Sequence, residues 1–343
     1  MIIDVHTHFV PEQLPSMKNR SGSDRWPVLQ CVCGHEDHKH VMISGKNFRT
    51  ITDQCWSPHR RIAEMDFEGI DMQVLSPMPE LLSYWFEPKD TLEFSRSING
   101  QLSEFIQNNP KGFIGLGMVP LQDPLLAAKE LRGLKHEFGL KGIEIGTHIN
   151  GKSIGDPMFH SFFAEAEAQQ MIIFVHALHP FGSDRHVGSP IMSNLIGFPT
   201  ENAFALGSLV TGGILERFPN LKIYSSHGGG SFSSILPRLE YGWTTMEDIQ
   251  KIIPKPPSYY AKKIYYDTLV YDVDTVDYLI RKFGSQQLMI GSDYPFSIRE
   301  KNPGHWLEQM ELTEDQKKQI QSQNAIGFFN IQYIRGAKNP ISH

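Results

Sequence analysis

Two histidines near the start of the chain have the spacing of a metal-binding pair. They lie in the run Asp4-Val5-His6-Thr7-His8, at the end of a short apolar segment. Side chains of a β-strand alternate between its two faces, so His6 and His8 are expected to point to the same side. A His-x-His pair alone is a weak signal, because polar residues are common where strands end. The pair gains meaning only if other metal-ligand residues gather beside it.

Other residues of the metal-ligand type occupy similar places further along the chain. His176, His227 and Asp293 each end or directly follow a short apolar run rich in β-branched residues. Imidazoles and a carboxylate that leave one coordination position open are typical of a catalytic zinc site. Iron and manganese accept the same ligand types, so the residues alone do not select the metal. The pattern indicates one divalent metal ion, with the exact ligand set still open.

The apolar runs that precede these residues recur as strands of a repeated βα pattern. Each short run is followed by a longer helical pattern, as in a parallel sheet with helical crossovers. We count eight runs, the number that closes a barrel. The expected strands are 2–6, 72–75, 113–116, 142–145, 172–176, 222–225, 264–267 and 288–291, and the clearest helical stretches are 90–109, 124–137, 157–170, 200–217 and 273–283. The sequence therefore predicts an α/β fold, a (β/α)₈ TIM barrel, whose strand ends bring the candidate ligands together.

The segment from about residue 9 to residue 58 does not fit the βα pattern. It is rich in Pro, Ser, Gly and scattered charge, and a helix is expected only from Arg61. Loops that follow barrel strands lie at the catalytic face, so we interpret this segment as a small β-rich insertion that caps the mouth. Residues 1–331 are then expected to form a single metal-dependent barrel domain, followed by a polar tail at 332–343.

The insertion also carries a second group of metal-ligand residue types. These are Cys31, Cys33, His35, His38 and His40. A structural metal would need paired ligands, but Cys-x-Cys lacks the usual spacing of zinc fingers. A polar hairpin with incidental histidines is the favoured interpretation, and a second metal remains open.

Composition narrows the class of partner and the compartment. The net charge of −6 and the absence of a Lys/Arg run argue against nucleic acid. No apolar run approaches the roughly 18 residues that span a bilayer, so a membrane protein is not expected. An odd count of three cysteines argues against a disulfide framework and for a reducing, cytoplasmic location.

Taken together, the candidate residues resemble the amidohydrolase superfamily. Its barrels carry His-x-His on strand 1, histidines on strands 5 and 6, and an aspartate on strand 8. No lysine ends the fourth run, Gly142-Ile-Glu-Ile-Gly146, so the resemblance is to the mononuclear branch. Within that branch the chain is similar to decarboxylases of muconate semialdehydes, from residue 1 to about 331. The motifs are Gly45-Lys-Asn-Phe-Arg49, Cys55-Trp56, Arg61-Ile-Ala-Glu-Met-Asp66, Gly142-Ile-Glu-Ile-Gly-Thr-His148, His227-Gly-Gly-Gly-Ser231 and Gly291-Ser-Asp-Tyr-Pro-Phe296.

The resemblance implies a zinc-dependent, non-hydrolytic decarboxylase of aromatic or tryptophan catabolism. One Zn²⁺ would be bound by His6, His8, His176 and Asp293, with Asp293 also counted among the catalytic residues. His227 would be the acid/base residue that activates metal-bound water. Arg49 and Arg238 would hold substrate carboxylates, because planar guanidinium groups bind them with two hydrogen bonds, and Phe296 would contact the substrate. In the resembled family such an arginine crosses a dimer interface, which implies a homodimer completed by Arg238.

One departure from the family pattern makes the substrate less certain than the reaction. The family continues with Pro-Trp-Asp-Met after the strand 5 histidine, whereas this chain has His176-Ala-Leu-His179-Pro180-Phe181. An aromatic wall is lost and an imidazole is gained beside the expected site. An alternative is a hydrolase or hydratase of the same superfamily, acting on a carboxylated lactone or an unsaturated acid. A further alternative is a metal-holding barrel without activity.

Overall fold

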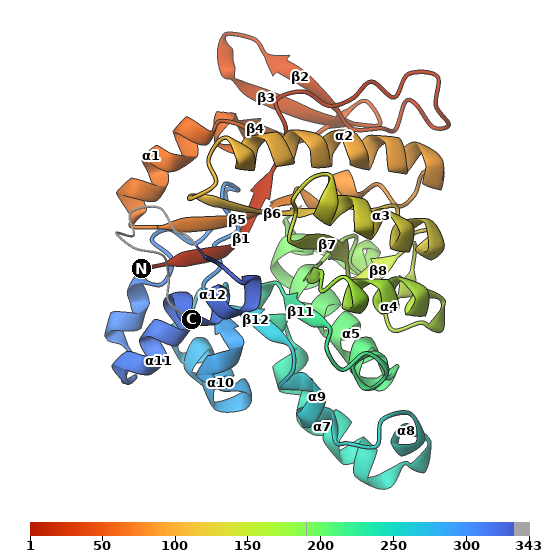
Figure 1. Cartoon of the computed structure of the whole chain (residues 1–343), viewed down its shortest axis with the longest axis vertical. Coiled ribbons are helices and arrows are strands. Elements are labelled where there is room, and N and C mark those ends of the chain that lie inside the picture. The colour runs from red at the N-terminus through yellow and green to blue at the C-terminus, as the bar shows by residue number, and fades with distance from the viewer. Residues whose placement is uncertain (190, 333–343) are drawn as a thin grey trace.

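An eight-stranded parallel sheet forms the centre of the protein, which is described from a computed structural model over residues 1–189 and 191–332. The strands follow one another around the sheet in the order β1-β5-β6-β7-β10-β11-β12-β13, and Figure 1 shows helices packed outside them. Their bounds are β1 Ile3–Phe9, β5 Met72–Pro77, β6 Phe113–Gly117, β7 Gly142–Gly146, β10 Ile172–His176, β11 Lys222–Ser225, β12 Tyr265–Asp267 and β13 Leu288–Met289. Each of the eight predicted runs thus overlaps a strand.

Backbone hydrogen bonds between β1 and the segment that includes and follows β13 close the sheet. The Val5 amide donates to the Ile290 carbonyl at 2.8 Å, and the His8 amide donates to the Tyr294 carbonyl at 2.7 Å. Between them, the Asp293 amide donates to the His6 carbonyl at 2.9 Å. These bonds lie beside the candidate ligands, so closing the barrel also fixes the distance between the first and last strands. The predicted TIM barrel is confirmed.

The strands are buried on both faces, as parallel strands covered by helices must be. One apolar cluster fills the barrel interior and includes Val5, Val74 and Phe174, and Phe328 and Phe329 of the last helix close it at one end. A larger cluster lies between the sheet and the surrounding helices. The polar residues that follow the strands therefore sit at the opposite, C-terminal mouth, above an apolar floor.

The helices that cross over between strands begin and end at identifiable residues. They are α1 Pro58–Glu68, α2 Pro88–Gln107, α3 Pro124–His136, α4 His160–Ala168, α5 Phe198–Thr211, α6 Ile214–Arg217, α7 Phe232–Thr245, α8 Glu247–Ile252, α9 Pro257–Ala261, α10 Val273–Phe283, α11 Glu314–Lys318 and α12 Asn324–Phe329. Helix α1 begins three residues before the predicted Arg61, because the Ser57 side chain caps it and Pro58 fills its first turn. The predicted helix 200–217 divides into α5 and α6 at Gly213, whose φ of 75° is left-handed.

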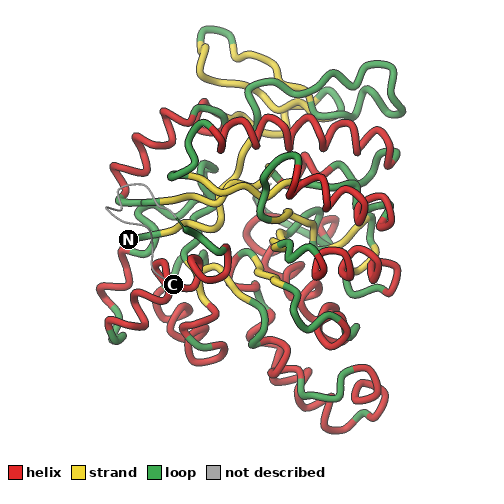
Figure 2. The backbone as a smooth tube through the Cα atoms, in the orientation of Figure 1, coloured by secondary structure: helices red, strands yellow, loops and turns green. Residues whose placement is uncertain are grey.

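The insertion after β1 is β-rich, as predicted, and its strands form a three-stranded antiparallel sheet. Its strands are β2 Val28–Val32, β3 His35–Ile43 and β4 Lys46–Thr52. Figure 1 shows it projecting from one end of the molecule next to α2, and Figure 2 shows the long loop that leads into it. Trp26 anchors this loop by stacking on Phe86, with ring centroids 3.7 Å apart. A second small sheet, β8 His148–Ile149 with β9 Lys152–Ser153, follows β7.

No helix in the described part of the chain is long and apolar enough to cross a membrane. Residues 333–343 of the predicted polar tail lie outside the described residues.

Candidate metal centre

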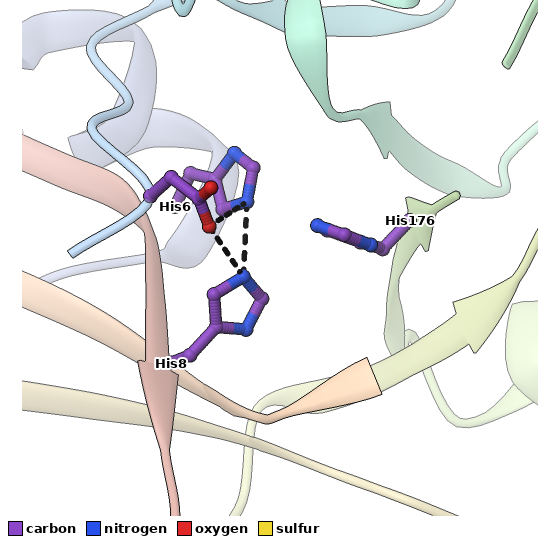
Figure 3. A group of neighbouring side chains, drawn as sticks. His6, His8 and His176 are labelled. Carbon is purple, nitrogen blue, oxygen red and sulfur yellow. Dashed lines mark hydrogen bonds and ion pairs between the residues drawn. The ribbon is translucent and has the colours of Figure 1, made fainter. Parts of the chain in front are cut away.

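Three histidines and an aspartate converge at the C-terminal mouth of the barrel. One ligand atom from each of His6, His8, His176 and Asp293 lies within 4.8 Å of the others, and all four residues are buried. The Nε2 atoms of His6 and His8 are 3.2 Å apart, and the Asp293 Oδ1 atom lies 3.0 Å from His8 Nε2. Figure 3 shows the His176 ring projecting from its own strand toward the His6 and His8 rings. The structure thus brings together all four residues of the predicted ligand set.

A hydrogen bond to the Nδ1 atom holds each of the three rings. His6 Nδ1 lies 2.6 Å from the Asp267 carboxylate, His8 Nδ1 lies 3.3 Å from the Pro77 carbonyl, and His176 Nδ1 lies 2.8 Å from the Ala177 carbonyl. An acceptor at Nδ1 fixes the hydrogen there and leaves Nε2 with a free lone pair. All three lone pairs are therefore available to the centre of the cluster.

The protonation of the cluster also fits a cation. Burial and the neighbouring His8 and His6 lower the pKa of His176 well below its usual value. Burial would raise the pKa of Asp293, but the neighbouring His8 and His6 lower it to about 2. The His176 Nε2 atom is buried without a hydrogen-bond partner among the described residues. A buried polar atom of this kind is costly, and a divalent metal would satisfy it, so these four residues fit such an ion.

Glycine is required where the last strand passes the first. A Cβ atom on Gly291 would lie 2.9 Å from the His6 Cβ and 2.8 Å from the Asp267 Cβ. Cβ atoms in real structures essentially never approach so closely. Both neighbours are held in place because the His6 and Asp267 side chains are hydrogen-bonded to each other. Gly291 therefore lets Asp293 reach the two histidines of β1.

His227 lies beside the cluster with its ring held in one orientation. Its ring centroid is 5.2 Å from that of His176 and 5.3 Å from that of His6. The Asn202 amide nitrogen lies 3.2 Å from His227 Nδ1, and an amide nitrogen only donates, so the ring hydrogen is placed on Nε2. Burial and the nearby His6 lower the pKa of His227 to about 4. The neutral ring borders a cavity of about 310 Å³ that also reaches Asp293.

Arg49 of β4 places a positive charge next to the metal cluster. Its guanidinium lies 3.8 Å from the centre of the Phe296 ring, and Phe296 stacks on His8 at 5.0 Å. Among the described residues no carboxylate lies within ion-pair distance of Arg49, although Asp293 and Glu80 act on it electrostatically. An unpaired, largely desolvated guanidinium is suited to a carboxylate ligand. Arg49 and Phe296 line a second, smaller cavity of about 30 Å³, which Asp293 also borders.

Arg238 lies away from this cavity in a single chain. It is exposed on α7, between Ile235 and Leu239. Those two residues line a separate cavity of about 730 Å³ with Phe181 and Phe204, which are both more than half exposed. The predicted substrate arginine is therefore not brought together with the other site residues.

Two carboxylates of the centre were not assigned a role from the sequence. Asp267 ends β12 and accepts hydrogen bonds from His6 and from the backbone amides of Gly228 and Leu269. The signal was a buried acid at a strand end, the same position that identified Asp293. Glu144 on β7 faces inward, 3.8 Å from His8 Nδ1, and burial raises its pKa to about 8.

The histidines of the insertion form a smaller, exposed group. The structure brings His35 and His38 together with Asp37. Cys31 and Cys33 are free and exposed, and neither belongs to that group. His40 instead contacts the Thr50 side chain at 2.9 Å.

Comparisons with known proteins agree with this geometry. The sequence matches the amidohydrolase family profile over residues 3–331. It is 36% identical over 331 residues to 2-amino-3-carboxymuconate-6-semialdehyde decarboxylase of Dictyostelium discoideum, covering 96% of this chain and 91% of that protein. The protein of the same name from Caenorhabditis elegans is 28% identical, covering 96% and 94%. The solved structure of dihydroxybenzoic acid decarboxylase from Polaromonas sp. JS666, with bound manganese and the inhibitor 2-nitroresorcinol, matches at a TM-score of 0.77 and 20% identity, over 96% of both chains.

The barrel and its cluster of histidines and aspartate define the class of divalent-metal (β/α)₈ enzymes. The chain belongs to the amidohydrolase family, and within that family it is a carboxy-lyase.

We expect Asp267→Asn to weaken metal binding by about 10- to 100-fold, because the His6 ring loses its charged hydrogen-bond partner. Metal affinity would be measured by titration of the metal-free protein against a competing chelator. The control is Asp274→Asn, the same change at an exposed position on α10. Equal affinities of both variants and the wild type would exclude this role for Asp267.

Proposed function

We propose that this protein is a zinc-dependent, non-hydrolytic decarboxylase of 2-amino-3-carboxymuconate 6-semialdehyde or a close analogue. The observation that carries the proposal is the unpaired Arg49 guanidinium, which stacks on Phe296 directly beside the buried cluster of three histidines and Asp293. A neutral amide substrate has no need of such a cation, whereas a carboxylate does. The names of the relatives support the same reaction.

Different residues of this chain have different roles in the proposed reaction. Arg49 holds a carboxylate by charge-assisted hydrogen bonds, and Phe296 packs against the conjugated chain of the substrate. The bond to the departing carboxylate breaks as its electron pair moves into the conjugated aldehyde, and carbon dioxide leaves. His227 Nε2 exchanges the proton that takes its place on carbon. A bound divalent cation supplies Lewis-acid stabilisation of the negative charge that develops on the substrate.

Zinc is the metal that we propose, with manganese as the competitor to be tested. Three imidazoles and one carboxylate suit Zn²⁺, but they also accept Mn²⁺. A related decarboxylase structure contains manganese. Elemental analysis of protein purified without added metal, followed by activity after reloading with each ion, would decide between them.

The central test offers the purified protein the ring-opened product of 3-hydroxyanthranilate. We expect the chromophore of the substrate to disappear as one equivalent of carbon dioxide is released. Product mass distinguishes the alternatives, because a hydrolase or hydratase would add the mass of water and release no carbon dioxide. That second result would refute the proposed reaction.

We propose that the active unit is a homodimer in which Arg238 completes the neighbouring site. Arg238 is exposed and lies beside an apolar surface that includes Phe181, Phe204 and Ile235. An exposed apolar patch of this kind is typical of a protein–protein interface, and most homo-oligomers are two-fold dimers. The exposed, free Cys31 and Cys33 support a reducing, cytoplasmic location for this assembly.

We expect His227→Asn to retain the metal but to lower turnover by about 10²- to 10⁴-fold, because proton transfer by a positioned residue contributes that much. The measurements are metal content and the rate of carbon dioxide release. His59→Asn, at an exposed position on α1, is the matched control. Wild-type turnover in the His227→Asn protein would remove His227 from the mechanism.

We expect Arg49→Ala and Arg238→Ala each to abolish most activity, and a mixture of the two to recover part of it. If Arg238 acts in the neighbouring site, a mixed dimer has one intact site, and random exchange of subunits restores about a quarter of wild-type activity. Exchange would be confirmed with differently tagged chains. Activity that stays at the level of the separate variants despite exchange would show that Arg238 does not complete the partner's site.

A further inference from the structure

A second charged residue, Glu80, borders the cavity that contains Arg49. Glu80 lies in the 3₁₀ turn Pro79–Leu82 that follows β5, and with Arg49, Phe296 and His176 it lines the space next to the metal cluster. Glu80 lies near enough to act electrostatically on Arg49, but the two side chains do not form an ion pair. The cavity therefore presents a cation and an anion that do not neutralise each other by direct contact.

His179 holds the Glu80 carboxylate in place. His179 Nε2 lies 3.0 Å from Glu80 Oε2, and the Trp85 ring packs against the His179 ring at a centroid distance of 4.9 Å. The backbone of His179 has a left-handed φ of 46°, which non-glycine residues rarely adopt. Its carbonyl accepts a hydrogen bond from His148 Nε2 at 3.0 Å. Three loops at the mouth, after β5, β7 and β10, are thus linked through the group that holds Glu80.

The bond from His179 leaves part of the carboxylate available. An ionised carboxylate accepts at both oxygens, and His179 uses only Oε2. Among the described residues, no side chain or backbone group donates to Glu80 Oε1. Asp293, the other acidic group of this cavity, belongs to the metal cluster. Glu80 is therefore the carboxylate that a bound molecule can use as a hydrogen-bond acceptor.

We propose that Glu80 selects substrates that carry an amino or hydroxyl donor in addition to the carboxylate held by Arg49, and that it rejects a second carboxylate in the same position. Specificity of this kind combines a favourable contact with the wanted group and like-charge repulsion of the unwanted one. His179 acts as a positioning residue for Glu80. This inference rests on the proposed function, because it assumes that Arg49 binds the substrate carboxylate.

The test compares the binding of two aromatic acids that differ in one substituent. 3-Hydroxybenzoate carries a hydroxyl where benzene-1,3-dicarboxylate carries a second carboxylate. Dissociation constants for both would be measured by calorimetry on the metal-loaded protein, so no turnover is required. We expect the wild type to bind the hydroxy acid at least about tenfold more tightly, because a hydrogen bond to a charged group and the avoided repulsion act in the same direction.

The Glu80→Gln variant keeps the size of the side chain and removes its charge. We expect it to abolish most of this preference, mainly by tighter binding of the dicarboxylate, with metal content and thermal midpoint unchanged. Glu104→Gln, at an exposed position on α2, is the control for loss of one charge and should keep the wild-type ratio. His179→Ala should lower the ratio partially, since Glu80 then keeps its charge but loses its support.

Several outcomes would overturn the inference. A Glu80→Gln ratio equal to that of the wild type would exclude Glu80 as a selective group, and failure of the wild type to bind either acid would exclude a carboxylate site beside it. An unchanged ratio in His179→Ala would exclude the positioning role of His179. The proposed reaction is tested separately: binding with the expected ratio but no carbon dioxide release refutes the reaction and leaves the selectivity intact.

Discussion

The structure depends on one electrostatic constraint, the meeting of three imidazole nitrogens and an ionised carboxylate in a buried space at the end of the barrel. Their lone pairs face one another, and no protein donor among the described residues satisfies His176 Nε2. Desolvated groups of this kind are unfavourable unless a cation joins them. Asp267, Pro77 and Ala177 hold the rings in this arrangement from outside, so the surrounding protein supplies the orientation and the metal supplies the attraction.

Much of this arrangement could be predicted from the sequence, because it follows from strand periodicity. The alternation of side chains places His6 and His8 on one face, and parallel strands bring their C-terminal ends to one mouth. Apolar runs located all eight strands, and His176 and Asp293 were found by their positions at strand ends. The helix boundaries were less accurate, since Ser57 and Gly213 act through local capping and backbone conformation that apolar spacing does not reveal.

The parts that could not be predicted depend on contacts between loops. Glu80 and His179 are 99 residues apart, and nothing in either segment indicates that they meet. Arg49 was identified by its resemblance to a family motif, because it lies on β4 of the insertion, outside the repeated βα pattern that located the barrel strands. Asp267 differs: its position was visible, but a carboxylate that supports a ligand cannot be distinguished by residue type from one that is a ligand. The metal ligands thus lie at or just after the barrel strands, whereas Glu80 and His179, which we propose to select the substrate, lie in the connections between elements, where change is tolerated more readily.

The closure of β1 against the segment after β13 has a consequence for how the protein acquires its metal during synthesis. His6 and His8 leave the ribosome nearly 300 residues before Asp293, and the backbone hydrogen bonds between these segments can form only after Asp293 has emerged. Until then a nascent chain has these two imidazoles but not the complete site. The complete metal site therefore forms only late in folding. A bound ion then links the first strand to the last, so it stabilises the closed barrel and does not start its formation.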